Sequence, residues 1–156
     1  MRLLPGARSI ASAALLMAAC SAPPPPRAAP PPDPTTESWY ADTTAQIAAM
    51  AHDAESAFRR NRADEAAGIV QRCRPLMDRL LSAPRPTLAA MQAVSDVDQL
   101  YGEMLMRNGH YIWARDCFQK NLIRWKSWKP ASPDALRRMD LARSRIAECD
   151  RRSAAK

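Results

Sequence analysis

Prolines divide the chain into two parts, and this division limits the possible folds more than any other feature. Eight of the 14 prolines lie between residues 23 and 34, whereas the whole chain of 156 residues has only 4 glycines. A segment so rich in proline forms an extended spacer in the polyproline II conformation, with no core to join. Folding is therefore confined to residues 36–152, which is enough for one domain but too short for a large enzyme or a multidomain machine.

The folded part is poor in glycine and β-branched residues and rich in Ala, Leu, Met and Arg. This composition favours helices over sheets. Apolar residues recur at helical spacings in five segments whose ends fall at proline, glycine or helix-capping residues. We therefore predict an all-α domain of five amphipathic helices over residues 39–60, 63–82, 87–108, 110–126 and 133–150, followed by a disordered tail at 153–156.

The first 19 residues have the layout of a secretory signal peptide. Arg2 and Arg8 precede an uncharged run at residues 10–19, and two alanines stand directly before Cys20. The run is shorter than the about 20 residues that a membrane-spanning helix requires. The segment is therefore expected to direct export and not to remain as a membrane anchor.

Residues 16–20, with the sequence Leu-Met-Ala-Ala-Cys, resemble the lipobox of bacterial lipoproteins. The resemblance implies a diacylglyceryl group on the Cys20 sulfur, cleavage before this residue, and acylation of the new amino terminus. Such acyl chains hold a protein firmly on a membrane. Ser21 implies, by the same resemblance, sorting to the outer membrane on the periplasmic side, with residues 20–35 as the lipidated spacer. Ordinary secretion, with cleavage after Ala22, is the alternative.

A helix-turn-helix pattern spans the third and fourth predicted helices. Gly102 stands where two helices can cross closely, and Gly109 where a left-handed turn can join them. With these glycines, residues 95–128 resemble a tetratricopeptide repeat, which is a unit of 34 residues. Four further positions match the repeat and three depart from it: the matches are Leu105, Tyr111, Ala114 and Phe118, and the departures are Asp98, Tyr101 and Asn121.

A weaker copy of this pattern precedes it at an offset of 48 residues, so that Asn61 corresponds to Gly109. The resemblance implies a right-handed stack of helix pairs that the last helix caps. It also implies that a protein partner binds in a groove along the first helix of the better repeat, at positions Asp96, Gln99, Glu103, Met106 and Arg107. An irregular bundle of five helices is the alternative.

The chain lacks recognisable catalytic motifs. Beyond the signal segment it has two histidines, His52 and His110, and neither has a second ligand or a nucleophile at helical spacing. Met104, Met106 and His110 could attract Cu(I), but core packing explains Met104 and a groove face explains Met106. We therefore expect no catalytic residue, cofactor or metal, and we interpret the chain as a binding protein and not as an enzyme.

The cysteine count limits the disulfides. If Cys20 carries lipid, then Cys73, Cys117 and Cys149 remain, and at most one bridge can form. In a stack of helix pairs, Cys73 and Cys117 lie at similar depths on roughly parallel helices, so this pair is preferred in an oxidising compartment. Three buried, unpaired thiols are the alternative.

Charge is distributed unevenly along the chain. Residues 35–100 contain 7 basic and 9 acidic residues, whereas residues 101–156 contain 13 basic and 6 acidic ones. A positive surface attracts anionic lipid head groups, envelope polymers or an acidic protein, and nucleic acid does not fit an exported chain.

Interleaved tryptophan and lysine are typical of membrane interfaces. The predicted basic, membrane-facing residues are Trp125, Lys126, Trp128, Lys129, Arg137 and Arg138. Alternatively, Trp125 belongs to the core and Trp128 covers it.

Two functions fit these observations. The first is a lipid-anchored periplasmic adaptor or assembly factor, which holds a protein of the cell envelope in the groove of a helical repeat domain. The second is a binder of anionic lipid or envelope polymer, which acts through the basic C-terminal half. Both functions need no catalytic group.

Overall fold

The structure is a computed structural model that describes residues 32–155. Cys20 and the predicted signal peptide lie outside this part of the chain. Within it, a short 3-10 turn and five α-helices follow one another without any strand, so the predicted all-α class is confirmed. None of these helices is long and apolar enough to cross a membrane. The elements are η1 (Pro34–Thr36), α1 (Ser38–Arg59), α2 (Ala63–Leu81), α3 (Leu88–Arg107), α4 (Tyr111–Ser127) and α5 (Pro133–Ala154).

Helix boundaries agree with the predicted ones to within one residue at every end except the last. Helix α5 continues to Ala154, so Ser153 and Ala154 are helical and the prediction of a disordered tail is wrong for them. The residues after 150 include no helix breaker, and arginines in the last turn interact favourably with the negative end of the helix dipole. Arg152 also forms an ion pair with Glu148 one turn earlier, at 2.8 Å.

The 3-10 turn η1 lies at the end of the predicted spacer and was not expected. Asp33 caps it, because its Oδ1 atom accepts a hydrogen bond from the Thr35 backbone N–H at 3.0 Å. This bond, together with one from the Thr35 hydroxyl, holds the pKa of Asp33 below its ordinary value. The predicted spacer, residues 20–35, therefore overlaps η1 by two residues.

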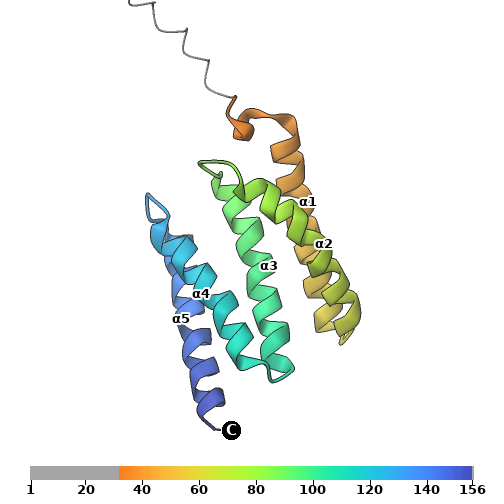
Figure 1. Ribbon diagram of the computed structural model, residues 1–156, viewed down its shortest axis with the longest axis vertical. Helices are drawn as coiled ribbons and strands as arrows, with labels where there is room; N and C mark the ends of the chain where they lie inside the picture. The colour runs from red at the N-terminus through yellow and green to blue at the C-terminus, as the bar shows by residue number, and fades with distance from the viewer. Residues whose placement is uncertain (1–31, 156) are drawn as a thin grey trace, which may run out of the picture. The chain divides into compact units, whose positions relative to one another are not determined.

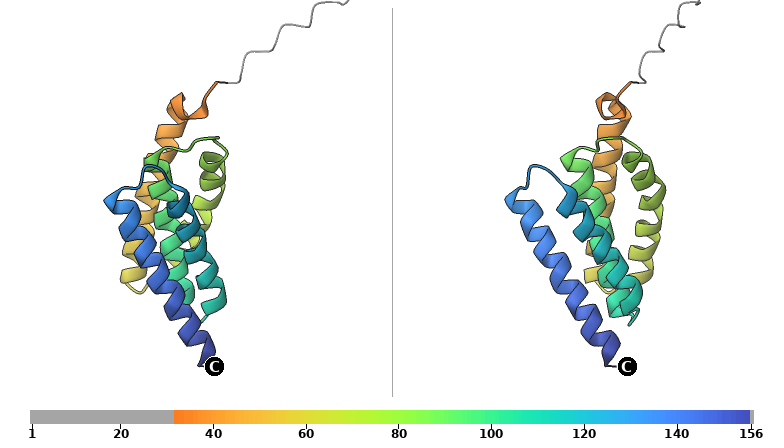
Figure 2. Two further views of the ribbon diagram at one scale, coloured as in Figure 1. Left: turned by 90° about the vertical axis from the view of Figure 1, so that its left-hand side faces the viewer. Right: turned by 60° about the vertical axis from the view of Figure 1, so that its left-hand side comes forward.

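Consecutive helices run in opposite directions, and α3 lies between the α1–α2 hairpin and the α4–α5 pair (Figures 1 and 2). Each helix packs mainly on its neighbours in sequence, and α1 also packs on α3. Helices α1, α3 and α5 consequently share one direction, while α2 and α4 share the opposite one (Figure 1).

The turns that close the two helix pairs have the same hydrogen-bond pattern. Gly109 follows α3 with a positive φ of 76°, as predicted, and Asn61 follows α1 with a φ of 63°. Beside Gly109, the His110 N–H donates to the Leu105 carbonyl at 2.9 Å; beside Asn61, the Arg62 N–H donates to the Ala57 carbonyl at the same distance. This is the Schellman arrangement. The two turns are offset by 48 residues, which is the offset of the sequence repeat.

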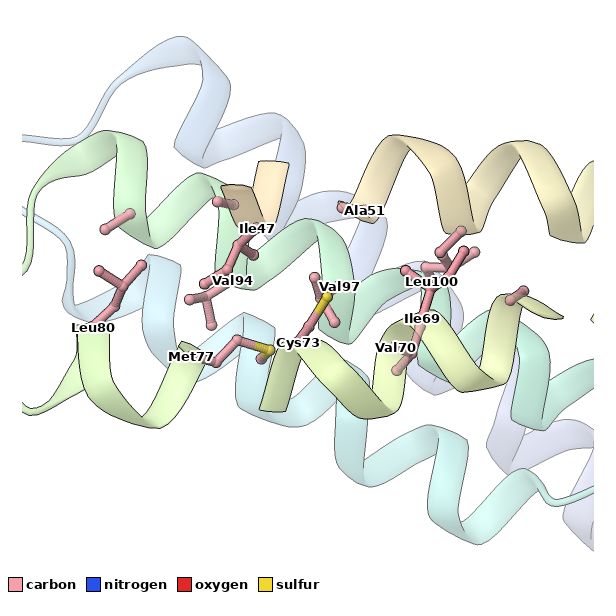
Figure 3. Packing of buried hydrophobic residues seen from close by; sticks show 14 of the residues in the cluster. Ile47, Ala51, Ile69, Val70, Cys73, Met77, Leu80, Val94, Val97 and Leu100 are labelled. Atoms are coloured by element: carbon pink, nitrogen blue, oxygen red, sulfur yellow. The ribbon is translucent and has the colours of Figure 1, made fainter. Parts of the chain in front are cut away.

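Two apolar clusters fill the interior. The larger one joins α1, α2 and α3, and its side chains meet between the three helices (Figure 3). The smaller one joins α3, α4 and α5 and contains Met106, Ala114, Phe118 and Cys149. Burial of these faces is the main stabilising contribution, because amphipathic helices of this length are not stable alone.

A polar network crosses the contact between α3 and α4. The indole N–H of Trp125 donates to the Ser95 hydroxyl at 2.8 Å, and the side-chain amide of Asn121 donates to the Ser95 carbonyl at 3.0 Å. Arg124 bonds to Asn121 and forms a salt bridge with Asp98 at 2.8 Å, where the two side chains are only 12% and 17% exposed. Two departures from the repeat pattern, Asp98 and Asn121, are therefore part of one network.

The predicted bridge between Cys73 and Cys117 is not formed. Both thiols are free and buried, as is Cys149. Cys73 points into the cluster of α1, α2 and α3, whereas Cys117 lines a hollow between α2 and α4 and is not part of that cluster. The pairing was based on depth along each helix, and it ignored the direction in which each side chain points.

Candidate partner-binding groove

A groove runs across the three helices that share one direction. Helix α3 lies between α1 and α5 and contributes the middle of the groove, which encloses about 530 Å³. Ala51 and Leu100 are buried in its floor, and Leu141 of α5 is 43% exposed at its edge. The lining residues are Ala48, Ala51, His52, Glu55, Phe58, Arg59, Asp96, Gln99, Leu100, Glu103, Leu141 and Arg145.

A second hollow of about 400 Å³ adjoins the first and shares Phe58, Glu103 and Arg145 with it. The predicted groove residues Asp96, Gln99 and Glu103 line the first hollow, and Met106 and Arg107 line the second. The structure therefore places all five along one continuous surface. Met106 itself is almost fully buried, while the Arg107 guanidinium stacks over the Phe58 ring at 5.1 Å.

Helices α3 and α5 are held in register by three polar contacts. The Gln92 side-chain amide donates to Asp134 Oδ2 at 3.0 Å, and Asp96 pairs with Arg138. Further along, Arg145 Nε lies 2.7 Å from Glu103 Oε1 in an ion pair that does not have the geometry of a hydrogen bond. Each pair is separated by 42 residues. A constant separation shows that the two helices run parallel without slipping.

The α1 side of the groove follows from the sequence repeat. Subtracting the offset of 48 from the five predicted positions gives Ala48, Ala51, Glu55, Phe58 and Arg59, and all five line the two hollows. Adding the offset of 42 to Gln99 and Glu103 gives Leu141 and Arg145 on α5. Sequence reasoning missed these residues, although the 48-residue offset was a sufficient signal for those on α1.

Charges along the groove are balanced within the domain. Glu55 pairs with Arg59 on α1, and Glu148 pairs with Arg145 at 3.0 Å and with Arg152 at 2.8 Å. Burial opposes ionisation of Glu148, but the hydrogen bonds from Arg145 and Arg152 prevail and lower its pKa. Because the carboxylates already have partners, the apolar floor offers more to a ligand than the charged rim does.

The predicted basic, membrane-facing surface is only partly formed. Trp125 is 1% exposed and belongs to the core, and Trp128 is half-buried against it with ring centroids 6.4 Å apart. Arg138 is held by Asp96 and Asp134. The prediction is therefore wrong for Trp125 and Arg138, because the contact between α3, α4 and α5 takes up both side chains. Lys126, Lys129 and Arg137 are exposed.

The three residues considered as copper ligands, Met104, Met106 and His110, do not lie together. Met104 is buried in the cluster of α1, α2 and α3, Met106 is buried in the other cluster, and His110 is exposed. Within residues 32–155, no group of three or more His, Cys, Asp or Glu side chains is placed to hold a metal ion.

No protein-family model, no curated protein and no solved structure matches this chain.

Proposed function

We propose that this protein is a lipid-anchored adaptor of the bacterial cell envelope, which holds a segment of a protein partner in the groove of α1, α3 and α5. The observation that carries the proposal is the groove itself. It is open, it has an apolar floor, and equivalent positions of three parallel helices line it. Grooves between helices are a common way to recognise peptides, and they require no catalytic group.

Two further observations support a tetratricopeptide-like stack as the architecture behind this groove. The turns at Asn61 and Gly109 share one hydrogen-bond pattern at the offset of the sequence repeat. The register between α3 and α5 is constant over three contacts. In such stacks each unit contacts mainly its neighbours, and the first helices of successive units form an extended binding surface.

The chemistry of the groove suggests what its ligand looks like. Ala51, Leu100 and Leu141 offer an apolar strip, and Gln99 and the exposed His52 offer polar contacts beside it. A peptide with one or two apolar side chains in an otherwise polar segment fits such a surface. A strongly charged peptide would have to break ion pairs that the domain already makes.

Two leucines of α5 allow a matched test of the groove. Leu141 lines it at 43% exposure, whereas Leu136 is 50% exposed and does not line it. A photocrosslinking amino acid at position 141 or 52 should capture one envelope protein in living cells, and the same probe at position 136 should not. Leu141→Arg should abolish the adduct formed from position 52, and Leu136→Arg should preserve it. Adducts that form equally from positions 52, 136 and 141 would contradict a groove-specific partner.

The lipid anchor of this proposal rests on the residues before Cys20. Mass spectrometry of the mature amino terminus should find cleavage before Cys20 and the mass of the attached acyl groups. Cys20→Ser should release the protein from the membrane fraction. A mature chain that begins after Ala22 without lipid would leave the adaptor unanchored and would refute this part of the proposal.

Binding of anionic lipid or envelope polymer is the second candidate, because Lys126, Lys129 and Arg137 remain exposed near the start of α5. Ionic strength distinguishes the two functions. Binding to a polyanion should weaken steeply as salt rises, whereas binding to an apolar groove should persist. Replacing these three side chains with Gln should abolish retention on anionic vesicles if the second function is real, and unchanged retention would refute it.

A further inference from the structure

Helix α4 is apolar on two sides, although the domain covers only one of them. Its inner side carries the buried Ala114, Cys117, Phe118 and Trp125. Its outer side carries Ile112 and Ile123, which are 70% and 60% exposed, and Trp113, which is 69% exposed, lies about 100° further around the helix beside a hollow that Ile123 also lines. Single exposed apolar residues are common, but three large ones on one helix indicate a surface that is covered by another molecule.

Two opposite charges on the same outer side have no partner within the domain. Beyond Tyr101, five of the six acidic residues form ion pairs, namely Glu103, Asp134, Asp140, Glu148 and Asp150. Asp116 is the sixth, and it is exposed and forms no ion pair with any described residue. Lys120, which is also exposed, lies one turn further along α4 and is in no ion pair with the described residues either.

Four of these five residues, all except Trp113, are arranged symmetrically along the helix. Ile112 and Ile123 lie equally far from a point midway between residues 117 and 118, while Asp116 and Lys120 lie equally far from residue 118. At a rise of about 1.5 Å per residue, the two midpoints differ by about 0.75 Å. A two-fold axis at this point would therefore place Ile112 opposite Ile123 and Asp116 opposite Lys120 in an antiparallel pair of α4 helices.

We propose that two copies of this chain associate through the outer side of α4, with Asp116 of one copy paired with Lys120 of the other. A two-fold interface must be self-complementary, and this face offers both an apolar pair and an opposite-charge pair at one register. A membrane fits the face less well, since an exposed carboxylate between Ile112 and Ile123 would meet anionic head groups.

The dimer does not depend on the proposed groove function. No residue of α4 lines either hollow of the groove, so the two surfaces do not compete. A dimer would present two grooves, and two linked sites bind a partner with repeated segments more tightly than either site alone.

Charge exchange tests the pairing directly. The full chain, purified in mild detergent, should sediment as a dimer. Asp116→Lys alone and Lys120→Asp alone should each weaken dimerisation by about tenfold or more, because like charges then face each other. The double variant Asp116→Lys/Lys120→Asp should dimerise like the parent, since the opposite charges face each other again in exchanged positions. Asp42→Lys, an exposed change on α1, serves as the control and should leave the dimer intact.

Three outcomes would overturn the proposal: a parent chain that is monomeric at the highest concentration it tolerates, a double variant no better than the single ones, or binding of α4 to anionic vesicles by the monomer. Thermal unfolding of each variant, followed by circular dichroism, verifies that the helices still form. Ile123→Gln provides a second route, because it removes the apolar pair without changing any charge, and it should also yield monomers.

Discussion

Gly102 on α3 lies directly under the ring of Phe118 on α4. A Cβ atom at position 102 would come within 2.6 Å of the Phe118 Cε1 atom and 2.7 Å of its Cζ atom. Both atoms belong to a ring that is fully buried and cannot swing aside. The close crossing predicted at Gly102 from the sequence is therefore confirmed, and it is this contact that sets how near α3 and α4 approach.

Gly102→Ala should destabilise the domain although alanine is the better helix former. The helical preference favours alanine by about 1 kcal/mol, but overpacking against Phe118 costs about 1–3 kcal/mol. We expect a net loss of about 1 kcal/mol in the free energy of unfolding, measured by denaturant titration. Gly68→Ala is the matched control, because the new Cβ would meet only the flexible Arg72 side chain at 3.7 Å. That variant should be more stable than the parent, and a similar gain at both positions would contradict the close crossing.

The Asn61→Ala variant should be less stable than the Asn61→Gly variant. The positive φ of 63° at this position is accessible to glycine but strained for alanine, so the alanine variant should lose about 1 kcal/mol relative to the glycine variant. Both variants lose the hydrogen bond that Arg107 donates to the Asn61 side chain, so their difference isolates the backbone. Thermal unfolding by circular dichroism provides the measurement. Equal stability of the two would show that the turn is not held in this conformation.

Ser95→Ala should cost about 1–3 kcal/mol, because it leaves the buried indole N–H of Trp125 without an acceptor. Ser127→Ala is the control, since the Ser127 hydroxyl is exposed and bonds only to a carbonyl of its own helix. Adding Trp125→Phe to Ser95→Ala removes the unsatisfied donor, so the two changes together should cost less than the sum of each alone. Strict additivity in this double-mutant cycle would rule out the bond.

Stability should decline at alkaline pH because of Cys117. Burial, reinforced by the negative charge of Asp98, raises the pKa of this thiol from 9.0 to about 11. The unfolded thiol loses its proton at lower pH than the folded one, so the free energy of unfolding should decrease as pH rises from about 9 to about 11, by about 2 kcal/mol. Cys117→Ala should flatten this part of the pH profile relative to the parent. A parallel decline in both proteins would assign the effect to other groups.

The sequence analysis named residues of one helix that line the groove and missed those of its two neighbours. Asp96, Gln99 and Glu103 share a face of α3 through helical spacing alone, so their common placement could be deduced locally. Leu141 and Arg145 of α5 join them only because α5, which packs on α4, runs beside α3 in the same direction, with its side chains paired to those of α3 at a constant separation of 42 residues. No periodicity within α5 specifies that register, since it depends on side chains from both helices.

The surroundings of Trp125 and of the cysteines could not be predicted from local sequence either. Trp125 beside Lys126 reads as a membrane-interface pattern, because alternating rings and charges look alike whether the ring faces lipid or a neighbouring helix. Trp125 is buried because α4 packs on α3, where Ser95, 30 residues earlier in the chain, supplies the acceptor for the indole N–H. The predicted bridge between Cys73 and Cys117 failed for a related reason, since depth along each helix could be deduced but the direction of each side chain could not: Cys73 points into the cluster of α1, α2 and α3, and Cys117 does not.

Local sequence features specified the five helices and every helix end except the last, the close helix crossing at Gly102 and the left-handed turn at Gly109. These features depend on backbone propensity, capping and apolar periodicity, which act over a few residues. The tertiary structure alone decided which faces of those helices stay uncovered: the groove of α1, α3 and α5, and the outer side of α4. Every helix here has apolar residues, and only the packing of segments that are distant in the sequence determines which of these residues stay exposed to a partner.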